Sequence, residues 1–303
     1  MSLDNIHILL SMCANCGKGE EDSVALKNCV ACKMVKYCSA ECQKAHRSQH
    51  KEECRKRAAE LHDEALFKQP PQKDECPICF LRMPPMHTGY RYQTCCGKII
   101  CSGCIHAGAM LVGDDELCPF CRTPFPTSNE EGVERIKKRV EVGDAMAIYN
   151  LACYYDEGKF DLPQDWDKAL ELWHRAGELG NAHSYHNIGH EYMTGRSVEG
   201  DMKKATQYFE LAAMGGYESA RHNLGIIEKH AGSFDRALKH LMIAAGGGSN
   251  ESLTLIQRMY KNGHAVKDDY MNALRAYQTY LGEIRSDDRD KAAAFSDIFK
   301  YYE

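Results

Sequence analysis

The chain has 303 residues, of which 44% are hydrophobic and 27% charged, and its formal charge is −5. These values are ordinary for a globular protein and exclude a disordered or collagen-like chain. No apolar run reaches the roughly 18 residues of a membrane span, and residues 6–10 are too short for a secretory signal. We therefore expect a protein of about two domains. We also expect an intracellular location, cytoplasmic or nuclear, and no membrane partner.

The cysteines are the unusual feature of the composition. Of the sixteen, fifteen lie between Cys13 and Cys121, and only Cys153 follows them. Because no export signal is recognised, such a cluster indicates metal sites rather than disulfides. We interpret Cys153 as a buried free thiol.

The first cluster contains eight potential ligands in four closely spaced pairs. Two tetrahedral zinc sites need this number of ligands. Short loops between the pairs favour an interleaved arrangement, in which the first and third pairs share one ion and the second and fourth share the other. Cys38 and Cys42, like His50 and Cys54, are spaced to share a helix face. His46 remains a rival to His50 as a ligand. The predicted ligands are Cys13, Cys16, Cys29, Cys32, Cys38, Cys42, His50 and Cys54.

This stretch resembles the MYND zinc finger, over residues 13–54. The match is carried by Tyr37-Cys38-Ser39-x2-Cys42-Gln43 and by His50-Lys51-x2-Cys54. The resemblance implies a small protein-interaction module that docks peptides, often proline-rich ones, and has no catalytic role of its own. Some methyltransferases carry such a finger together with a large β-rich SET domain, but the helical remainder of this chain excludes that class.

The second cluster supplies eight cysteines, again in four pairs, and resembles a RING finger whose ligands are all cysteine. Gly97-Lys98 stands where the family usually has Gly-His, and a protonated lysine cannot bind zinc, so the adjacent cysteines 95 and 96 must supply the middle pair. His106 or His87 could replace one of them. An interleaved arrangement again assigns the first and third pairs to one ion and the second and fourth pairs to the other. The predicted ligands are Cys76, Cys79, Cys95, Cys96, Cys101, Cys104, Cys118 and Cys121.

The RING resemblance implies a ubiquitin ligase that binds a ubiquitin-conjugating enzyme and ubiquitin and acts by positioning rather than by covalent chemistry. Ile78 and Pro119 would contact the conjugating enzyme, with a third contact near Met110. Arg122 would hydrogen-bond both the enzyme and ubiquitin through its planar guanidinium. The alternative is that Ile78 and Pro119 are turn and packing residues of a non-catalytic scaffold.

The remaining chain repeats itself with a period near 36 residues. Repeat units start at Gly143, Gly180, Gly216 and Gly248, and a second element of each unit starts near Ala169, Ala205, Ala237 and Ala273. Two helices per unit predict a helical solenoid. The pattern resembles Sel-1-like repeats, which are related to the tetratricopeptide repeat, and this resemblance implies binding of peptide or protein partners. We expect residues 286–303 to form a helix that covers the last apolar face. His183, His186 and His190 share a helix face, but repeat position explains them better than a metal site.

Together these patterns predict a mostly α protein with two small zinc-stabilised fingers and an all-α solenoid. The expected segments are a MYND finger at 13–54, a linker helix at 55–70, a RING-like finger at 76–122 and repeats at 130–303. We expect four zinc ions and the function of a RING-type ligase or adaptor, with a non-catalytic interaction scaffold as the alternative. Residues 1–75 carry 12 basic and 12 acidic side chains, so a nucleic-acid partner is not expected.

Overall fold

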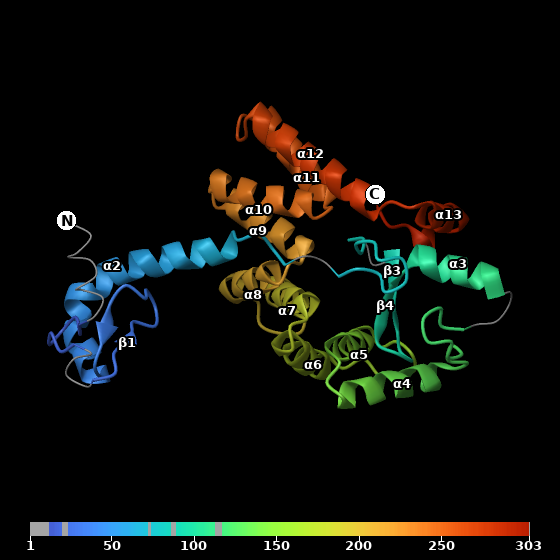
Figure 1. Ribbon diagram of the computed structural model, residues 1–303, viewed down its shortest axis with the longest axis horizontal. Coiled ribbons are helices and arrows are strands. Elements are labelled where there is room, and N and C mark those ends of the chain that lie inside the picture. Colours follow the sequence, from blue (N-terminus) through green and yellow to red (C-terminus); the bar gives the residue numbers. More distant parts are fainter. Residues whose placement is uncertain (1–11, 20–23, 72–73, 86–88, 113–116, 303) are drawn as a thin grey trace. The chain divides into compact units, whose positions relative to one another are not determined.

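The computed structural model describes residues 12–19, 24–71, 74–85, 89–112 and 117–302, without the side chains of 111 and 112. The chain divides at residue 68 into two compact units. The first unit holds the first finger, and the second holds the second finger and the helical repeats (Figure 1). Among the described residues, no helix is both long and apolar enough to cross a bilayer.

The first unit is a short hairpin followed by one long helix. Strands β1 (Lys27–Asn28) and β2 (Lys36–Tyr37) pair antiparallel, and helix α2 spans Ala40–Leu66. The helix of the finger therefore continues without a break into the segment predicted as a linker helix. It begins at Ser39, whose extended backbone and side-chain hydrogen bond to the Cys42 N–H form an N-cap. Cys38 consequently precedes the helix, and the expectation that it shares a helix face with Cys42 is wrong.

The second finger combines a hairpin with a single helix. Strands β3 (Tyr90–Gln93) and β4 (Lys98–Cys101) pair antiparallel, with Tyr90 opposite Cys101, and helix α3 (Ser102–Val112) follows directly. The finger has a small core made of Met83, Ile100 and its cysteines. Few apolar side chains are therefore available to hold this segment folded.

The rest of the second unit is a row of antiparallel helix pairs, mostly α as the sequence predicts. An entry helix, α4 (Asn129–Glu141), precedes four pairs. The pairs are α5 (Ala145–Glu157) with α6 (Trp166–Glu178), α7 (Ala182–Thr194) with α8 (Met202–Met214), α9 (Glu218–His230) with α10 (Phe234–Gly246), and α11 (Asn250–Lys261) with α12 (Lys267–Ile284). The first helix of each pair ends at or just before a glycine with positive φ, for example Gly158 and Gly195.

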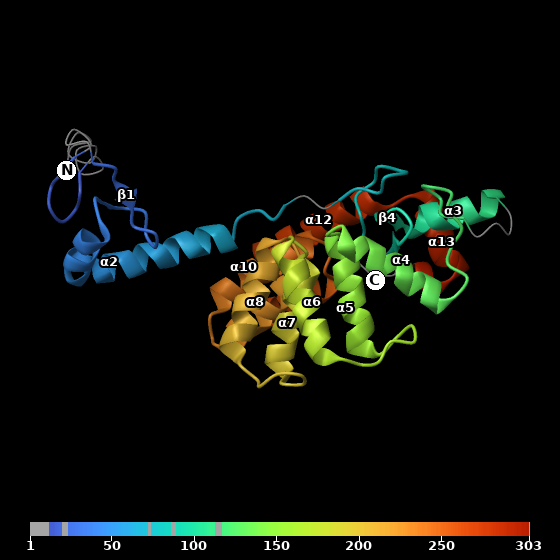
Figure 2. The same ribbon diagram turned by 90° about the horizontal axis from the view of Figure 1, so that it is seen from below.

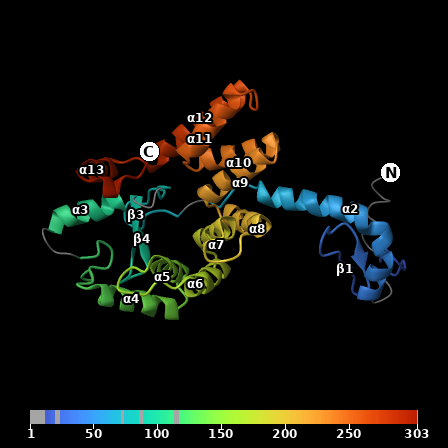
Figure 3. The same ribbon diagram turned by 180° about the vertical axis from the view of Figure 1, so that it is seen from behind.

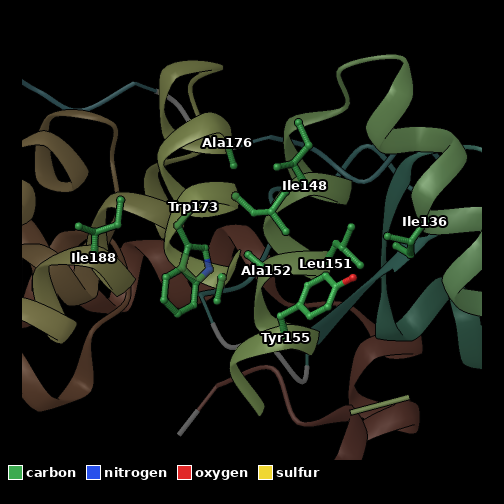
Figure 4. Packing of buried hydrophobic residues seen from close by; sticks show 10 residues of the cluster. Ile136, Ile148, Leu151, Ala152, Tyr155, Trp173, Ala176 and Ile188 are labelled. Carbon is green, nitrogen blue, oxygen red and sulfur yellow. The ribbon is translucent and has the colours of Figure 1, made fainter. Parts of the chain in front are cut away.

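Small residues at fixed repeat positions allow the helices to approach closely. Figure 4 shows the core of the first pair, where Ala152 and Ala176 lie among Ile148, Leu151 and Trp173. These side chains are almost fully buried. The same alanine pattern continues through the later pairs, so the core is a continuous stripe along the row.

The second finger lies on the inner side of the curve that the helix row forms (Figures 1 and 3). The Tyr92 hydroxyl donates to Asp144, at the start of the row, over 2.7 Å. Near the other end, the Tyr280 hydroxyl donates to the Met83 carbonyl over 3.0 Å. The finger is therefore held at both ends of the row by residues far apart in sequence.

The C-terminal segment packs against both the second finger and the last repeat helix. Helix α13 (Asp287–Phe295) lies against α3 of the second finger, as Figure 2 also shows. The short helix η3 (Asp297–Phe299) follows, and its Phe299 carbonyl accepts a hydrogen bond from the Ser102 hydroxyl at the start of α3. The Phe295 and Phe299 rings flank His106 of α3 at ring-centre distances of 5.1 and 6.0 Å. We expected this segment to cover the last face of the solenoid, and it does so in part, because Ala293 and Tyr301 pack with Tyr280 and Ile284 of α12, while α13 also lies on the finger.

Candidate metal centres

Four Cys-x2-Cys segments share one backbone conformation. In each, the N–H of the residue after the second cysteine donates to the carbonyl of the first cysteine over 2.9 Å. That residue has φ between 57° and 73°, which costs a non-glycine residue about 1–2 kcal/mol. A knuckle of this kind directs both sulfurs to one point, so a bound ion would offset the strain. In these four knuckles, the residue with positive φ is Gly17, Lys33, Phe80 and Arg122, respectively.

The predicted ligands gather into four groups, with the interleaving expected from the sequence. Within each group, all ligand atoms lie within 4.8 Å of one another. The groups are Cys13, Cys16, Cys38 and Cys42; Cys29, Cys32, His50 and Cys54; Cys76, Cys79, Cys101 and Cys104; and Cys95, Cys96, Cys118 and Cys121. No disulfide joins any of these cysteines.

The spacing of the sulfur atoms fits a tetrahedral zinc ion. Zn–S bonds of about 2.3 Å place neighbouring sulfurs about 3.8 Å apart. The closest sulfur pairs across the four groups lie 3.3–3.9 Å apart. Four thiolates, or three thiolates and an imidazole, are donor sets typical of structural zinc with no open position. The arrangement fits a metal that stabilises the fold.

The crowding of thiols requires a cation for all of them to ionise. Hydrogen bonds from Cys38 to Cys42 and Cys16 raise the pKa of the Cys38 thiol to about 12. Burial, followed by hydrogen bonding with Cys29, raises the pKa of Cys54 to about 12. A divalent ion removes this penalty, because each ligand binds as the thiolate. Metal binding is therefore expected to release protons and to weaken at low pH.

His50, rather than His46, lies in the second group. Its Nε2 atom is 3.2 Å from the Cys32 sulfur, and its ring is buried. The Nδ1 atom of His46 instead lies 3.1 Å from the Tyr37 hydroxyl, and its ring stacks on His50 at 5.7 Å. One turn of α2 separates the two histidines, so His46 supports the ring of its neighbour from the side.

The middle pair of the second finger consists of Cys95 and Cys96 in the structure. Lys98, at the position where the RING family usually has histidine, places its Nζ atom 5.9 Å from the centre of the Phe120 ring. His106 points to α13 and belongs to none of the four groups. His87, the other alternative ligand, lies outside the described residues.

An arginine that sequence reasoning missed contacts the Cys76–Cys104 group. Arg289 of α13 is fully buried. Its Nη1 atom donates to the carbonyls of Arg82 and Ile284, and its Nη2 atom lies 3.4 Å from the Leu81 carbonyl and 3.9 Å from the Cys79 sulfur. Burial lowers the pKa of this guanidinium, but the nearby thiols outweigh that effect and raise it. A positive charge beside four thiolates favours the metal-loaded state.

The predicted contacts to a conjugating enzyme lie on two knuckles and on α3. Ile78 is 37% exposed and Met110 is 71% exposed, and Arg122 is also exposed. Pro119 is half-buried because α3 approaches it at Gly108, where an added Cβ atom would lie 3.0 Å from the Pro119 side chain. Gly108 was not singled out in the sequence, since only the fold shows which residue of α3 faces Pro119.

The family comparisons match the first finger and part of the helix row. The model of the MYND finger matches residues 13–54, and that of the Sel1 repeat matches residues 145–181 and 182–217. The chain contains a MYND finger and Sel1 repeats. The two matched repeats coincide with the first two helix pairs, and the structure continues the same arrangement through two further pairs.

Curated relatives of this MYND and Sel1 repeat chain share only parts of their length with it. The E3 ubiquitin-protein ligase GW2 of Oryza sativa is 28% identical over 101 residues, which is 30% of this chain and 23% of GW2. The ERAD-associated E3 ubiquitin-protein ligase component HRD3B of Arabidopsis thaliana is 25% identical over 112 residues, which is 37% of this chain and 17% of HRD3B. The chain thus spans about a quarter or less of the length of these relatives.

Solved structures with similarity include two repeat proteins. The Sel1 repeat protein of Oxalobacter formigenes has 25% identity and a TM-score of 0.45, covering 51% of this chain and 64% of that one. The protective antigen c5321 of uropathogenic Escherichia coli, which displays an SLR fold, has 25% identity and a TM-score of 0.43, covering 54% of this chain and 36% of that one.

Proposed function

We propose that this chain is a zinc-dependent ubiquitin ligase or ligase adaptor with four zinc ions. Its second finger would bind a charged ubiquitin-conjugating enzyme, and its MYND finger and Sel1 repeats would recruit protein substrates. The observation that carries the proposal is the second finger itself, with two interleaved four-cysteine groups and exposed side chains on its knuckles. An intracellular location, in the cytoplasm or the nucleus, fits thiols that must stay reduced to bind zinc.

The residues assigned to the conjugating enzyme have the chemistry that positioning requires. Ile78 offers an exposed apolar contact, and Pro119 stands on the second knuckle. Arg122 has an exposed guanidinium on a backbone held at φ 62°, so its direction is constrained. A side chain that bridges two partners binds them more favourably when its direction is fixed in advance, because it loses less conformational entropy on binding. The two ligase-related relatives support the same class of partner.

The test is a reconstituted transfer reaction with activating enzyme, a panel of conjugating enzymes, ubiquitin and ATP. We expect ubiquitin chains with the wild type and their loss, by about tenfold or more, in Ile78→Ala and Arg122→Ala. Leu179→Ala and Arg275→Ala are matched controls, because both side chains are exposed and belong to the helix row rather than to the finger. Absence of chains across the whole panel would contradict the ligase proposal and leave the non-catalytic scaffold.

Metal content tests the zinc assignment separately. Four zinc ions per chain are expected by elemental analysis, and two would show that one finger has been misinterpreted. With fifteen thiolates and four zinc ions, the formal charge changes from −5 to about −12. A clearly acidic protein fits protein partners better than nucleic acid.

A further inference from the structure

The third repeat departs from the apolar packing pattern at one buried pair. The residue five positions after each repeat glycine is Ile148 in the first repeat, Tyr185 in the second, Arg221 in the third and Leu253 in the fourth. The second helix of each pair starts near a recurring alanine, which is Ala169, Ala205, Ala237 and Ala273 in the four repeats. The residue three positions after this alanine is Leu172, Tyr208, His240 and Ala276, respectively. An apolar contact between the two helices is thus replaced by arginine and histidine in one repeat only. Helix packing alone does not explain this change.

Arg221 is buried without a negatively charged partner. Its side chain is 2% exposed, and its Nη1 atom lies 3.4 Å from Nδ1 of His240. Among the described residues, the Nε and Nη2 atoms have no hydrogen-bond partner. Burial alone lowers the pKa of Arg221 to about 10. A buried charge in this state is costly unless something pairs with it.

A cavity of about 420 Å³ lies beside this guanidinium. It is lined by Arg221, by Arg82 of the second finger and by the fourth-repeat residues Ala276 and Tyr280. Ala276 takes the place of the large Leu172 and Tyr208 of the earlier repeats, so the cavity opens where a bulky side chain is missing. The Nε atom of Arg82 is also buried without a partner, and its guanidinium lies over the Tyr280 ring at 4.6 Å.

We propose that this cavity binds a carboxylate of an acidic peptide segment. The free Nε and Nη2 atoms form one edge of the Arg221 guanidinium, where two parallel N–H groups match the two oxygens of a carboxylate. Its volume suits one or two residues of a peptide rather than a folded element. Of the two arginines that line the cavity, Arg82 is paired with Glu283 over 2.6 Å, so Arg221 is left to face an anion, and a singly charged carboxylate is balanced better than a doubly charged phosphate. The binding of this segment does not depend on ligase activity.

The direct test is the ¹⁵N resonance of the Arg221 Nε–H group in the full-length zinc-loaded chain. The probes are acetyl-trialanine with a free C-terminal carboxylate, acetyl-alanyl-glutamyl-alanine amide, its glutaminyl counterpart and inorganic phosphate. We expect a saturable shift at millimolar concentration with one or both carboxylate probes and none with the glutaminyl peptide. The two carboxylate probes distinguish a chain terminus from an acidic side chain.

Thermal stability of variants gives a second readout. Arg221→Met should fold with an unchanged or higher melting temperature, because an unpaired buried charge is removed, and should lose the stabilisation that the carboxylate probe gives the wild type. Arg221→Lys keeps the charge but not the paired N–H edge, and should bind about tenfold more weakly. Arg275→Met, an exposed arginine on α12, is the control and should keep the effect. No shift with either carboxylate probe, or a shift with phosphate alone, would overturn the proposal.

Discussion

Replacement of Arg289 by methionine tests whether the C-terminal helix supports the zinc centre of the second finger. The side chain is fully buried, and its guanidinium contacts the carbonyls of Leu81, Arg82 and Ile284. Methionine fills a similar volume but donates no hydrogen bond. Each buried acceptor left without a partner costs about 1–3 kcal/mol, and removal of one buried charged partner costs about 3–5 kcal/mol. We adopt the second range, because the guanidinium is a buried charge beside the thiols of the Cys76–Cys104 group.

A loss of about 3–5 kcal/mol corresponds to a fall of about 6–20 °C in the melting temperature for a unit of this size. Differential scanning calorimetry measures this fall. The Cys76–Cys104 centre should also lose zinc faster to a chelating indicator, because four thiolates and one zinc ion carry a net charge of −2 that Arg289 no longer offsets.

Arg285→Met is the matched control for this experiment. Arg285 lies one turn earlier in the chain, is exposed, and pairs with Asp290 over 3.1 Å. Its loss should change stability by less than about 1 kcal/mol. If Arg289→Met unfolds within about 0.5 kcal/mol of the wild type and releases zinc at the same rate, the supporting role is wrong.

Three further predictions concern metal, pH and the remaining thiol. Removal of zinc by a chelator should unfold residues 76–122, seen as collapse of their amide NMR signals; a retained near-native spectrum would contradict a metal-held fold. The pKa of Asp144 is lowered because hydrogen bonds from Tyr92, a backbone N–H and Arg139 outweigh the raising effect of burial. Its ionised form therefore stabilises the fold above about pH 4, and Asp144→Asn should cost about 1–2 kcal/mol there. That difference should vanish as the pH falls through the lowered pKa, and a constant difference in denaturation at all pH values would refute it. Burial raises the pKa of Cys153 to about 11, so a thiol reagent should label it slowly in the folded protein, and rapid labelling would show that it is accessible.

The local ligand pattern was readable from the sequence because close spacing leaves few ways to fold. A Cys-x2-Cys segment can point both sulfurs at one ion only by bending back, and the four knuckles do so with the same hydrogen bond. The interleaving of pairs and the choice of His50 over His46 followed from the same short spacings.

Contacts between distant segments were not readable in this way. The sequence predicted a cap on the last repeat, which Tyr301 provides at Tyr280 and Ile284. It did not predict that α13 also packs on α3, where Phe295 and Phe299 flank His106. Cys38 was placed on a helix that begins only after Ser39, because propensity does not reveal which residue forms the N-cap.

The sequence by itself therefore determined the number of metal-binding groups, the pairing of their ligands and the helical repeat, because each of these depends on spacings within about 40 residues. Only the tertiary structure decided that Arg289 lies beside Cys79, 210 residues away, and that Arg221 faces a cavity next to Arg82. The curvature of the helix row brings these groups together, and curvature is the sum of many small packing angles that no short pattern records.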